Sequence, residues 1–126
     1  MTTWSSDELR KISTADELAI ASKRPDGTLR RPVTIWVVSV GDDLYVRSVR
    51  GRGSGWFQGA QVRHEGLIEA GGVEKDVTFA DVEDDTNLAD QIDAAYRSKY
   101  RRYAASIVNS TLTSQARAAT LKLVPR

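Results

Sequence analysis

The chain has 126 residues, with 18 Lys and Arg against 17 Asp and Glu, one His and no Cys, which fits a single domain spanning residues 1–126. A net charge of +1 excludes a global field that attracts nucleic acid or anionic membranes, and the absence of Cys excludes disulfides and thiolate chemistry. The first residues lack a secretory signal, and no stretch approaches the roughly 20 apolar residues that span a bilayer, so we expect a soluble, cytoplasmic protein.

The N-terminal half predicts a short helix followed by strands. In "SSDELRKI", Ser and Asp precede an amphipathic turn in which Leu9 and Ile12 lie three residues apart, a helix-start pattern. Residues 17–49 then contain three strand-like runs separated by "RPDG" and "GDD", both of which are typical of tight turns. The middle run, residues 33–40, is apolar on both faces, which predicts a strand covered on both sides.

The second half predicts a hairpin, one long helix and a closing strand. "SGWFQGA" could form a short helical turn, and residues 65–82 read as a hairpin that folds at Gly71 and Gly72. From residue 86 to about 103 the apolar residues recur every four positions, which indicates a helix, and acidic residues such as Asp84 and Asp93 gather toward its start. "ARAATLKLVPR" alternates as a last strand that stops at Pro125. The sequence therefore predicts a mainly β domain, a six-stranded antiparallel barrel with two helices.

The loop "RSVRGRGSGW", residues 47–56, is the strongest candidate site. Its arginines can each bind two phosphate oxygens, and its glycines let the backbone approach a ligand closely. A helix beginning in "SGWFQGA" would add backbone N–H groups. The candidate ligand-binding residues of this loop are Arg47, Ser48, Arg50, Arg52 and Trp56. The alternative is a mobile, solvated connection whose arginines pair with nearby acidic residues.

Aromatic residues offer a second candidate feature. Trp36 and Trp56 could flank a planar ring, although a tryptophan in the middle of a strand is commonly a core residue. On the long helix, Tyr96, Lys99 and Tyr100 either close over a ligand or a second subunit, or form a core-facing stripe with a basic flank. The sequence shows no nucleophile–base arrangement or metal-ligand spacing, so any chemistry would rest on a bound cofactor.

These residues also carry a resemblance to known families. "RPDGTLRRPVTIWVVSVGDDLYVRSVRGRGSGWFQGA" and "IDAAYRSKY" resemble a bacterial family of unknown function, over residues 4 to 124. More remotely, the order of strands, basic loop, hairpin, helix and last strand is similar to the split β-barrels of the pyridoxamine 5′-phosphate oxidase-like group and the deazaflavin-dependent nitroreductases. Two features depart from that group: the glycine-rich stretch is longer than its phosphate loops, and no substrate-binding signature of the oxidases is present.

The remote resemblance implies a homodimer that binds FMN or a deazaflavin at the subunit interface. It places the cofactor phosphate on Arg47, Ser48, Arg50 and Arg52. It places the flavin ring along the second strand, at Thr34, Ile35 and Trp36. The leading hypothesis is thus a flavin- or deazaflavin-dependent oxidoreductase acting on a small organic substrate.

Two other functions remain open. One is a non-catalytic split barrel that binds or stores a cofactor or another phosphorylated ligand. The other is binding of single-stranded nucleic acid through "RGRGSGW", which mixes arginine, glycine and an aromatic residue. The neutral net charge and the shortness of the basic stretch rank nucleic acid last.

Overall fold

The computed structural model describes residues 3–82 and 85–126. The strands are β1 (Leu18–Ser22), β2 (Val33–Ile35), β3 (Val38–Val40), β4 (Asp43–Arg47), β5 (Glu65–Ala70), β6 (Val73–Asp81) and β7 (Thr120–Pro125). The helices are α1 (Ser6–Ser13), the 3₁₀ turn η1 (Gly51–Gly53), α2 (Gly55–Arg63), α3 (Thr86–Lys99), α4 (Ala105–Asn109) and α5 (Ser114–Arg117).

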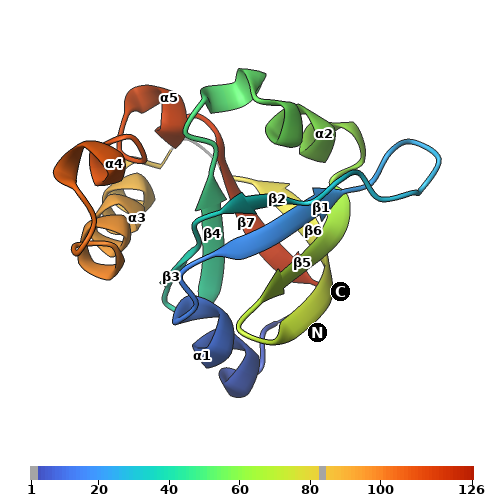
Figure 1. The fold of residues 1–126 in the computed structure, drawn as a ribbon, viewed down its shortest axis with the longest axis horizontal. Coiled ribbons are helices and arrows are strands. Elements are labelled where there is room, and N and C mark those ends of the chain that lie inside the picture. Colours follow the sequence, from blue (N-terminus) through green and yellow to red (C-terminus); the bar gives the residue numbers. More distant parts are fainter. Residues whose placement is uncertain (1–2, 83–84) are drawn as a thin grey trace.

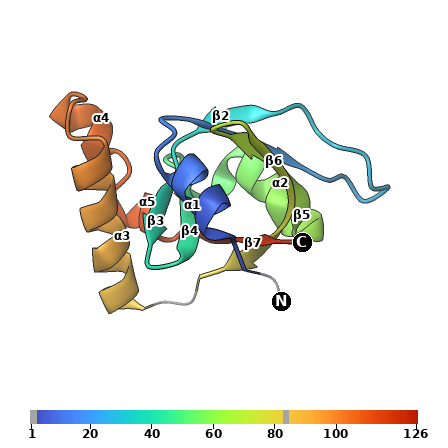
Figure 2. The same ribbon diagram turned by 90° about the horizontal axis from the view of Figure 1, so that it is seen from below.

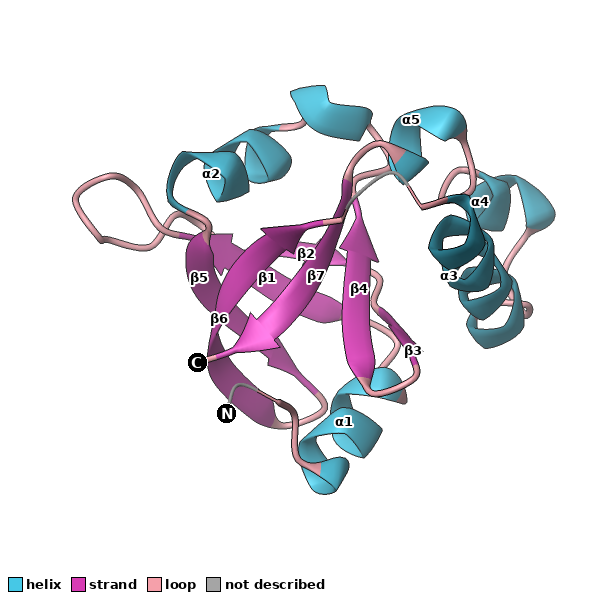
Figure 3. Ribbon diagram, turned by 180° about the vertical axis from the view of Figure 1, so that it is seen from behind, coloured by secondary structure: helices cyan, strands magenta, loops and turns pink. Residues whose placement is uncertain are grey.

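The strands form one antiparallel sheet in the order β2-β1-β5-β6-β7-β4-β3. Its two edge strands, β2 and β3, follow each other in the chain, so the sheet curls round into a barrel (Figures 1 and 3). The predicted mainly β, antiparallel barrel is confirmed. The predicted count of six strands is wrong, because the described residues contain seven.

The additional strand arises where residues 33–40 break in two, between Ile35 and Val38. At this break the Val37 N–H donates to the Tyr100 hydroxyl at 3.2 Å, and the Val37 carbonyl accepts from Lys99 Nζ at 2.5 Å. Side chains at the C-terminal end of α3 therefore bond to the backbone where a neighbouring strand would otherwise do so. The expectation of a strand covered on both faces fails for β2, where Val33 and Thr34 are exposed.

The helices lie around the barrel. Helix α1 lies at one end of the barrel (Figure 1) and begins with a capping box between Ser5 and Glu8. Helices α2 and α5 lie over the opposite end (Figure 1). Helix α3 stands beside β3 and β4 and ends at Lys99, earlier than predicted (Figure 2). Asp85 caps its first turn, and Asp84 lies outside the described residues. Helices α4 and α5 were not predicted. No helix in the described ranges has the length and apolar character needed to cross a membrane.

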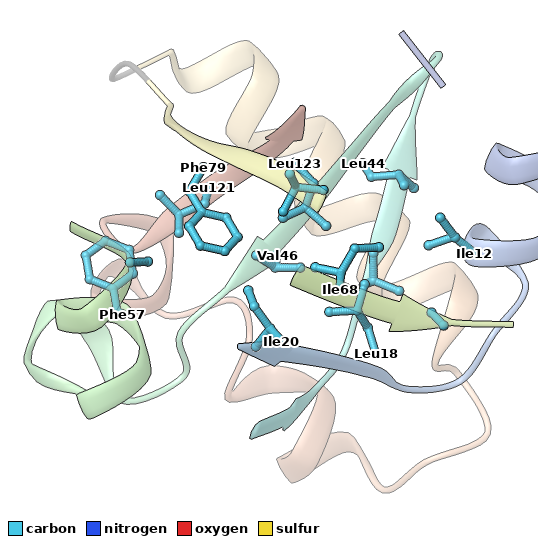
Figure 4. Packing of buried hydrophobic residues seen from close by; sticks show 14 of the residues in the cluster. Ile12, Leu18, Ile20, Leu44, Val46, Phe57, Ile68, Phe79, Leu121 and Leu123 are labelled. Atoms are coloured by element: carbon cyan, nitrogen blue, oxygen red, sulfur yellow. The ribbon is translucent and has the colours of Figure 1, made fainter. Parts of the chain in front are cut away.

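Two apolar clusters hold these elements together, and β4 contributes to both. Leu44 and Val46 point into the barrel interior, while Tyr45 packs on the outside against α3. The interior cluster includes Ile12, Leu18, Ile20, Ile68, Phe57, Phe79, Leu121 and Leu123 (Figure 4). The outer cluster is made of Val38, Tyr45, Ile92, Tyr96, Tyr100 and Val108. Successive side chains of β4 point to opposite faces, so this one strand both fills the barrel interior and holds α3 against the barrel wall.

Candidate functional site

The structure contains an open cavity of about 930 Å³, bounded by β2, the loop after β4, and the segment from α3 to α4. Seven of the eight predicted site residues line it: Thr34, Ile35, Trp36, Arg47, Ser48, Arg50 and Trp56. The other lining residues are Val33, Val49, Gly53, Ser54, Gly55, Tyr96, Ile107, Ser110 and Thr111. Residues from Val33 to Thr111, far apart in the sequence, therefore meet in one site.

The loop that follows β4 is folded back on itself. The hydroxyls of Ser48 and Ser54 are hydrogen-bonded at 2.6 Å, and the Gly51 N–H donates to the Ser48 carbonyl at 3.0 Å. Gly51 has a φ of +78°, which favours glycine. The Arg50 carbonyl accepts from Gln115 Nε2 at 2.7 Å, which ties the loop to α5. These contacts give the loop a defined shape at the cavity wall.

Helix α2 begins in this wall, and no side chain caps its N-terminus. Its N-cap residue is Ser54, whose hydroxyl bonds to Ser48 instead of to an N–H of the first turn. The first turn carries no acidic residue, and Gly53 and Gly55 have open space where a side chain would stand. The site thus combines free helix N–H groups with the exposed Arg50 side chain, a combination that suits an anion.

Arg47, predicted to hold a phosphate, is instead engaged inside the protein. Its side chain is fully buried, and Nη1 donates to Asp93 Oδ1 at 2.5 Å and to the Thr111 carbonyl at 2.9 Å. Nε donates to Thr120 Oγ1 at 3.1 Å, and Nη2 donates to the Ala89 carbonyl at 3.2 Å. Because each guanidinium nitrogen already has an internal acceptor, we remove Arg47 from the predicted phosphate ligands.

Asp93 joins this arginine to a second one. Arg117 donates from Nη2 to Asp93 Oδ2 at 2.7 Å and to Asp90 Oδ1 at 2.6 Å. Burial alone would raise the pKa of Asp93, but hydrogen bonds from Arg117 and Arg47 outweigh it and lower that pKa. The network connects β4, α3 and α5 behind the cavity.

Arg52 also departs from its predicted role. Its Nη1 donates to the Ala118 carbonyl at 2.9 Å, and its guanidinium lies 5.1 Å from the centre of the Phe57 ring. These contacts direct the side chain away from the cavity. Of the three arginines in the loop, only Arg50 both lines the cavity and is exposed.

Two aromatic residues of the predicted site, Trp36 and Trp56, line the cavity from different elements. Trp36 stacks on Tyr100 with ring centres 3.8 Å apart and planes 3° apart, and Tyr103 lies 5.1 Å away. Trp36 is half-buried: it packs on Tyr100 at the end of α3 and also lines the cavity. Trp56 packs edge-on against Phe57 at the start of α2.

Lys99 and Tyr100 support the segment that carries Trp36. The Tyr100 hydroxyl donates to the Asp16 carbonyl at 2.7 Å, and both side chains bond to the Val37 backbone beside Trp36. Burial lowers the pKa of Lys99 to about 8. Neither residue lines the cavity, and both side chains bond to the backbone at the strand break.

The sequence analysis did not identify Ile107 or the Ser110–Thr111 turn, and it considered Tyr96 only as a residue that closes over a ligand or packs in the core. Tyr96 follows the four-residue period of the helix, which identifies a buried position and says nothing about a cavity. Ile107 and the turn belong to α4 and its end, a helix of five residues that is too short to give a periodic pattern.

Comparison with solved structures supports the fold. A proposed pyridoxamine 5′-phosphate oxidase from Listeria innocua superimposes with a TM-score of 0.62 and 12% identity, covering 94% of this chain and 90% of that one. An F420 reductase matches with a TM-score of 0.52 and 15% identity, over 93% and 90% of the two chains. A FAD-binding protein from Mesorhizobium loti matches with a TM-score of 0.50 and 18% identity, over 98% and 89%. The split-barrel fold is thereby confirmed.

The comparison with curated proteins gave no match. Residues 8–123 match a family described as "Uncharacterized protein conserved in bacteria (DUF2255)". That range covers nearly the whole chain, including every residue that lines the cavity. The chain therefore belongs to the bacterial DUF2255 family.

Proposed function

We propose that this protein binds a phosphorylated flavin-type cofactor, FMN or a deazaflavin, in the cavity and acts as an oxidoreductase on a small organic substrate. The observation that carries the proposal is the composition of one cavity, which has an anion-binding corner at Arg50 and the start of α2, and an aromatic wall at Trp36. A phosphorylated molecule with a planar ring presents these same two features.

The size and chemistry of the cavity support this choice. A volume of about 930 Å³ lies at the upper end of the range for small-molecule and cofactor sites. The uncapped N–H groups of α2 attract phosphate oxygens, and Arg50 adds a full positive charge. The names of two structural neighbours, an F420 reductase and a FAD-binding protein, agree with a flavin-type ligand.

The residues present fit such a cofactor, which would supply hydride transfer when bound. The protein would hold the phosphate at Arg50 and the first turn of α2; Ser48, which is 1% exposed and hydrogen-bonded to Ser54, would support the loop from within. Trp36, Thr34 and Ile35 would lie along the ring and shield it from water. Among the lining residues, none is a carboxylate or a histidine. Because the lining offers no such acid or base, a second candidate function is also supported: a split barrel that binds or stores the cofactor without turnover.

We further propose that the protein works as a homodimer whose second copy covers the open side of the cavity. Strand β2 is a sheet edge, and its Val33 is 39% exposed at the cavity wall. Val49, at 47%, and Ile107, at 49%, are also exposed there. Sedimentation velocity should give a dimer of about twice 13.9 kDa; a monomer at all concentrations contradicts this proposal.

The cofactor proposal is tested by comparing Arg50→Ala with the matched variant Arg52→Ala. Both remove one arginine from the same loop, but only Arg50 lines the cavity. Because a charge-assisted hydrogen bond contributes about 1.5–3 kcal/mol, Arg50→Ala should weaken FMN binding by roughly tenfold or more and leave riboflavin binding unchanged. Arg52→Ala should bind both like the wild type.

The readout is flavin fluorescence anisotropy, with the phosphorylated deazaflavin titrated in parallel. Equal losses for FMN and riboflavin in Arg50→Ala, or equal effects of the two variants, would contradict the assignment of the phosphate to this corner. Turnover with an added reductant then separates the oxidoreductase from the non-catalytic carrier.

A further inference from the structure

The hydroxyl of Tyr96 is a buried donor with no partner. Tyr96 is 0% exposed and lies at the buried, inner end of the cavity lining, and no described acceptor takes a hydrogen bond from its hydroxyl; the Arg47 backbone N–H points toward the same oxygen. Burial raises the pKa of this phenol far above its ordinary value, so the hydroxyl keeps its proton at any physiological pH. A buried polar group without a partner costs free energy, and such groups are rare in folded proteins.

The neighbouring hydroxyl groups already donate their hydrogen bonds within the protein. The Thr111 hydroxyl donates to the Val108 carbonyl at 2.6 Å, and the Ser110 hydroxyl donates to the Ile107 carbonyl at 2.5 Å. The proton of each is therefore used within α4 and its final turn. Trp36 and Ile107 make the rest of this end of the cavity apolar. Of the hydroxyls at this end, Tyr96 alone has a proton left to donate.

The local charge at this end is balanced. The guanidinium carbon of Arg47 lies 5.6 Å from the centre of the Tyr96 ring, and Arg47 is paired with Asp93. Arg117 is paired with Asp93 and Asp90, so two positive and two negative charges form the network. Because the charges of the network cancel, it attracts neither an anionic nor a cationic ligand strongly. A neutral acceptor suits the donor best.

We propose that the inner end of the cavity is a second subsite, which takes a neutral ligand with an apolar or aromatic body and a carbonyl-type acceptor that receives the Tyr96 proton. The proposal rests on the proposed function, since it takes the cofactor phosphate to be bound at Arg50. The proposal names the chemical class of the substrate that would bind beside the cofactor. Tyr96 is the binding residue, and Trp36 and Ile107 contact the apolar body.

The test uses a pair of probes of nearly equal shape, acetophenone and α-methylstyrene, which differ by a carbonyl oxygen in place of a methylene group. Binding to the ¹⁵N-labelled protein is followed by the amide shifts of Ile107 and Thr111, with and without FMN. One neutral hydrogen bond corresponds to a preference of roughly three- to tenfold for acetophenone. Tyr96→Phe should abolish the preference, whereas Tyr103→Phe, which lies outside the cavity, should retain it.

Equal binding of the two probes to the wild type, a preference that survives in Tyr96→Phe, or no binding of either probe would overturn the proposal. Tighter binding of benzoate than of acetophenone would also overturn it, because the subsite would then select negative charge. If FMN does not bind but the acetophenone preference and its loss in Tyr96→Phe are seen, the cofactor proposal fails while the subsite stands.

Discussion

Tyr96 on helix α3 and Tyr100 at its C-cap provide a matched pair for measuring the free energy that the unpartnered hydroxyl costs. Tyr96 and Tyr100 lie one helical turn apart, and both are 0% exposed. The Tyr100 hydroxyl donates to the Asp16 carbonyl at 2.7 Å and accepts from the Val37 N–H at 3.2 Å, whereas the Tyr96 hydroxyl has no partner. Replacing each by Phe removes one oxygen at nearly constant volume.

The two replacements should have opposite effects on the free energy of unfolding. Tyr100→Phe leaves the buried Val37 N–H without an acceptor, which should cost about 1–3 kcal/mol. Tyr96→Phe removes a polar atom that already lacks a partner, so the free energy of unfolding should stay the same or rise by up to about 1 kcal/mol. Urea unfolding followed by tryptophan fluorescence gives both values, with equal m-values as the check on two-state behaviour.

The result that would refute the reasoning is a loss for Tyr96→Phe as large as that for Tyr100→Phe. Such a loss would mean that the Tyr96 hydroxyl has a partner in the folded protein. The donor would then be unavailable to a ligand, and the subsite proposal would lose its main support.

Three further predictions concern the framework of the site. Asp93→Ala leaves the buried charge of Arg47 unpaired and should lower the free energy of unfolding by about 3–5 kcal/mol. Because the pKa of Asp93 is lowered in the folded protein, its stabilising contribution is present above about pH 4 and is lost as acid protonates the folded protein. An unchanged acid-unfolding midpoint in the variant would contradict this. The pKa of Lys99 is lowered to about 8 in the folded protein, so above pH 8 the unfolded chain binds more protons than the folded protein does. The free energy of unfolding should therefore rise between pH 8 and 9.5. Lys99→Met should flatten that rise. Gly51→Ala should lower stability by about 1–3 kcal/mol because φ is +78° and the new carbon would stand 2.4 Å from Gln115 Cγ; wild-type stability in the variant would show that the loop relaxes freely.

Local chemistry made much of the fold predictable. The "RPDG", "GDD" and "GG" turns and the four-residue period of α3 each depend on neighbouring residues, so the sequence reveals them directly. The break between β2 and β3 depends on Lys99 and Tyr100, which lie more than 60 residues away in the chain. No pattern within residues 33–40 reports those contacts, and the run therefore looks like one strand.

The candidate site was predictable to a similar extent and for the same reason. A loop rich in arginine and glycine predicts an anion site, and the structure places Arg50 and the start of α2 in the cavity wall. The burial of Arg47 follows from Asp93, its partner 46 residues further along the chain. The sequence shows both charges but cannot show that they neutralise each other, nor that the Tyr96 hydroxyl is left without a partner.

The central claim, a phosphorylated flavin-type ligand in this cavity, is tested most directly by titrating the purified wild-type protein with FMN and with riboflavin under identical conditions. The two molecules share the ring system and differ by the phosphate. Binding of FMN at micromolar concentrations or below, with riboflavin at least about tenfold weaker, is the predicted result. Equal affinity for the two, or no binding of either FMN or the phosphorylated deazaflavin, would contradict the claim.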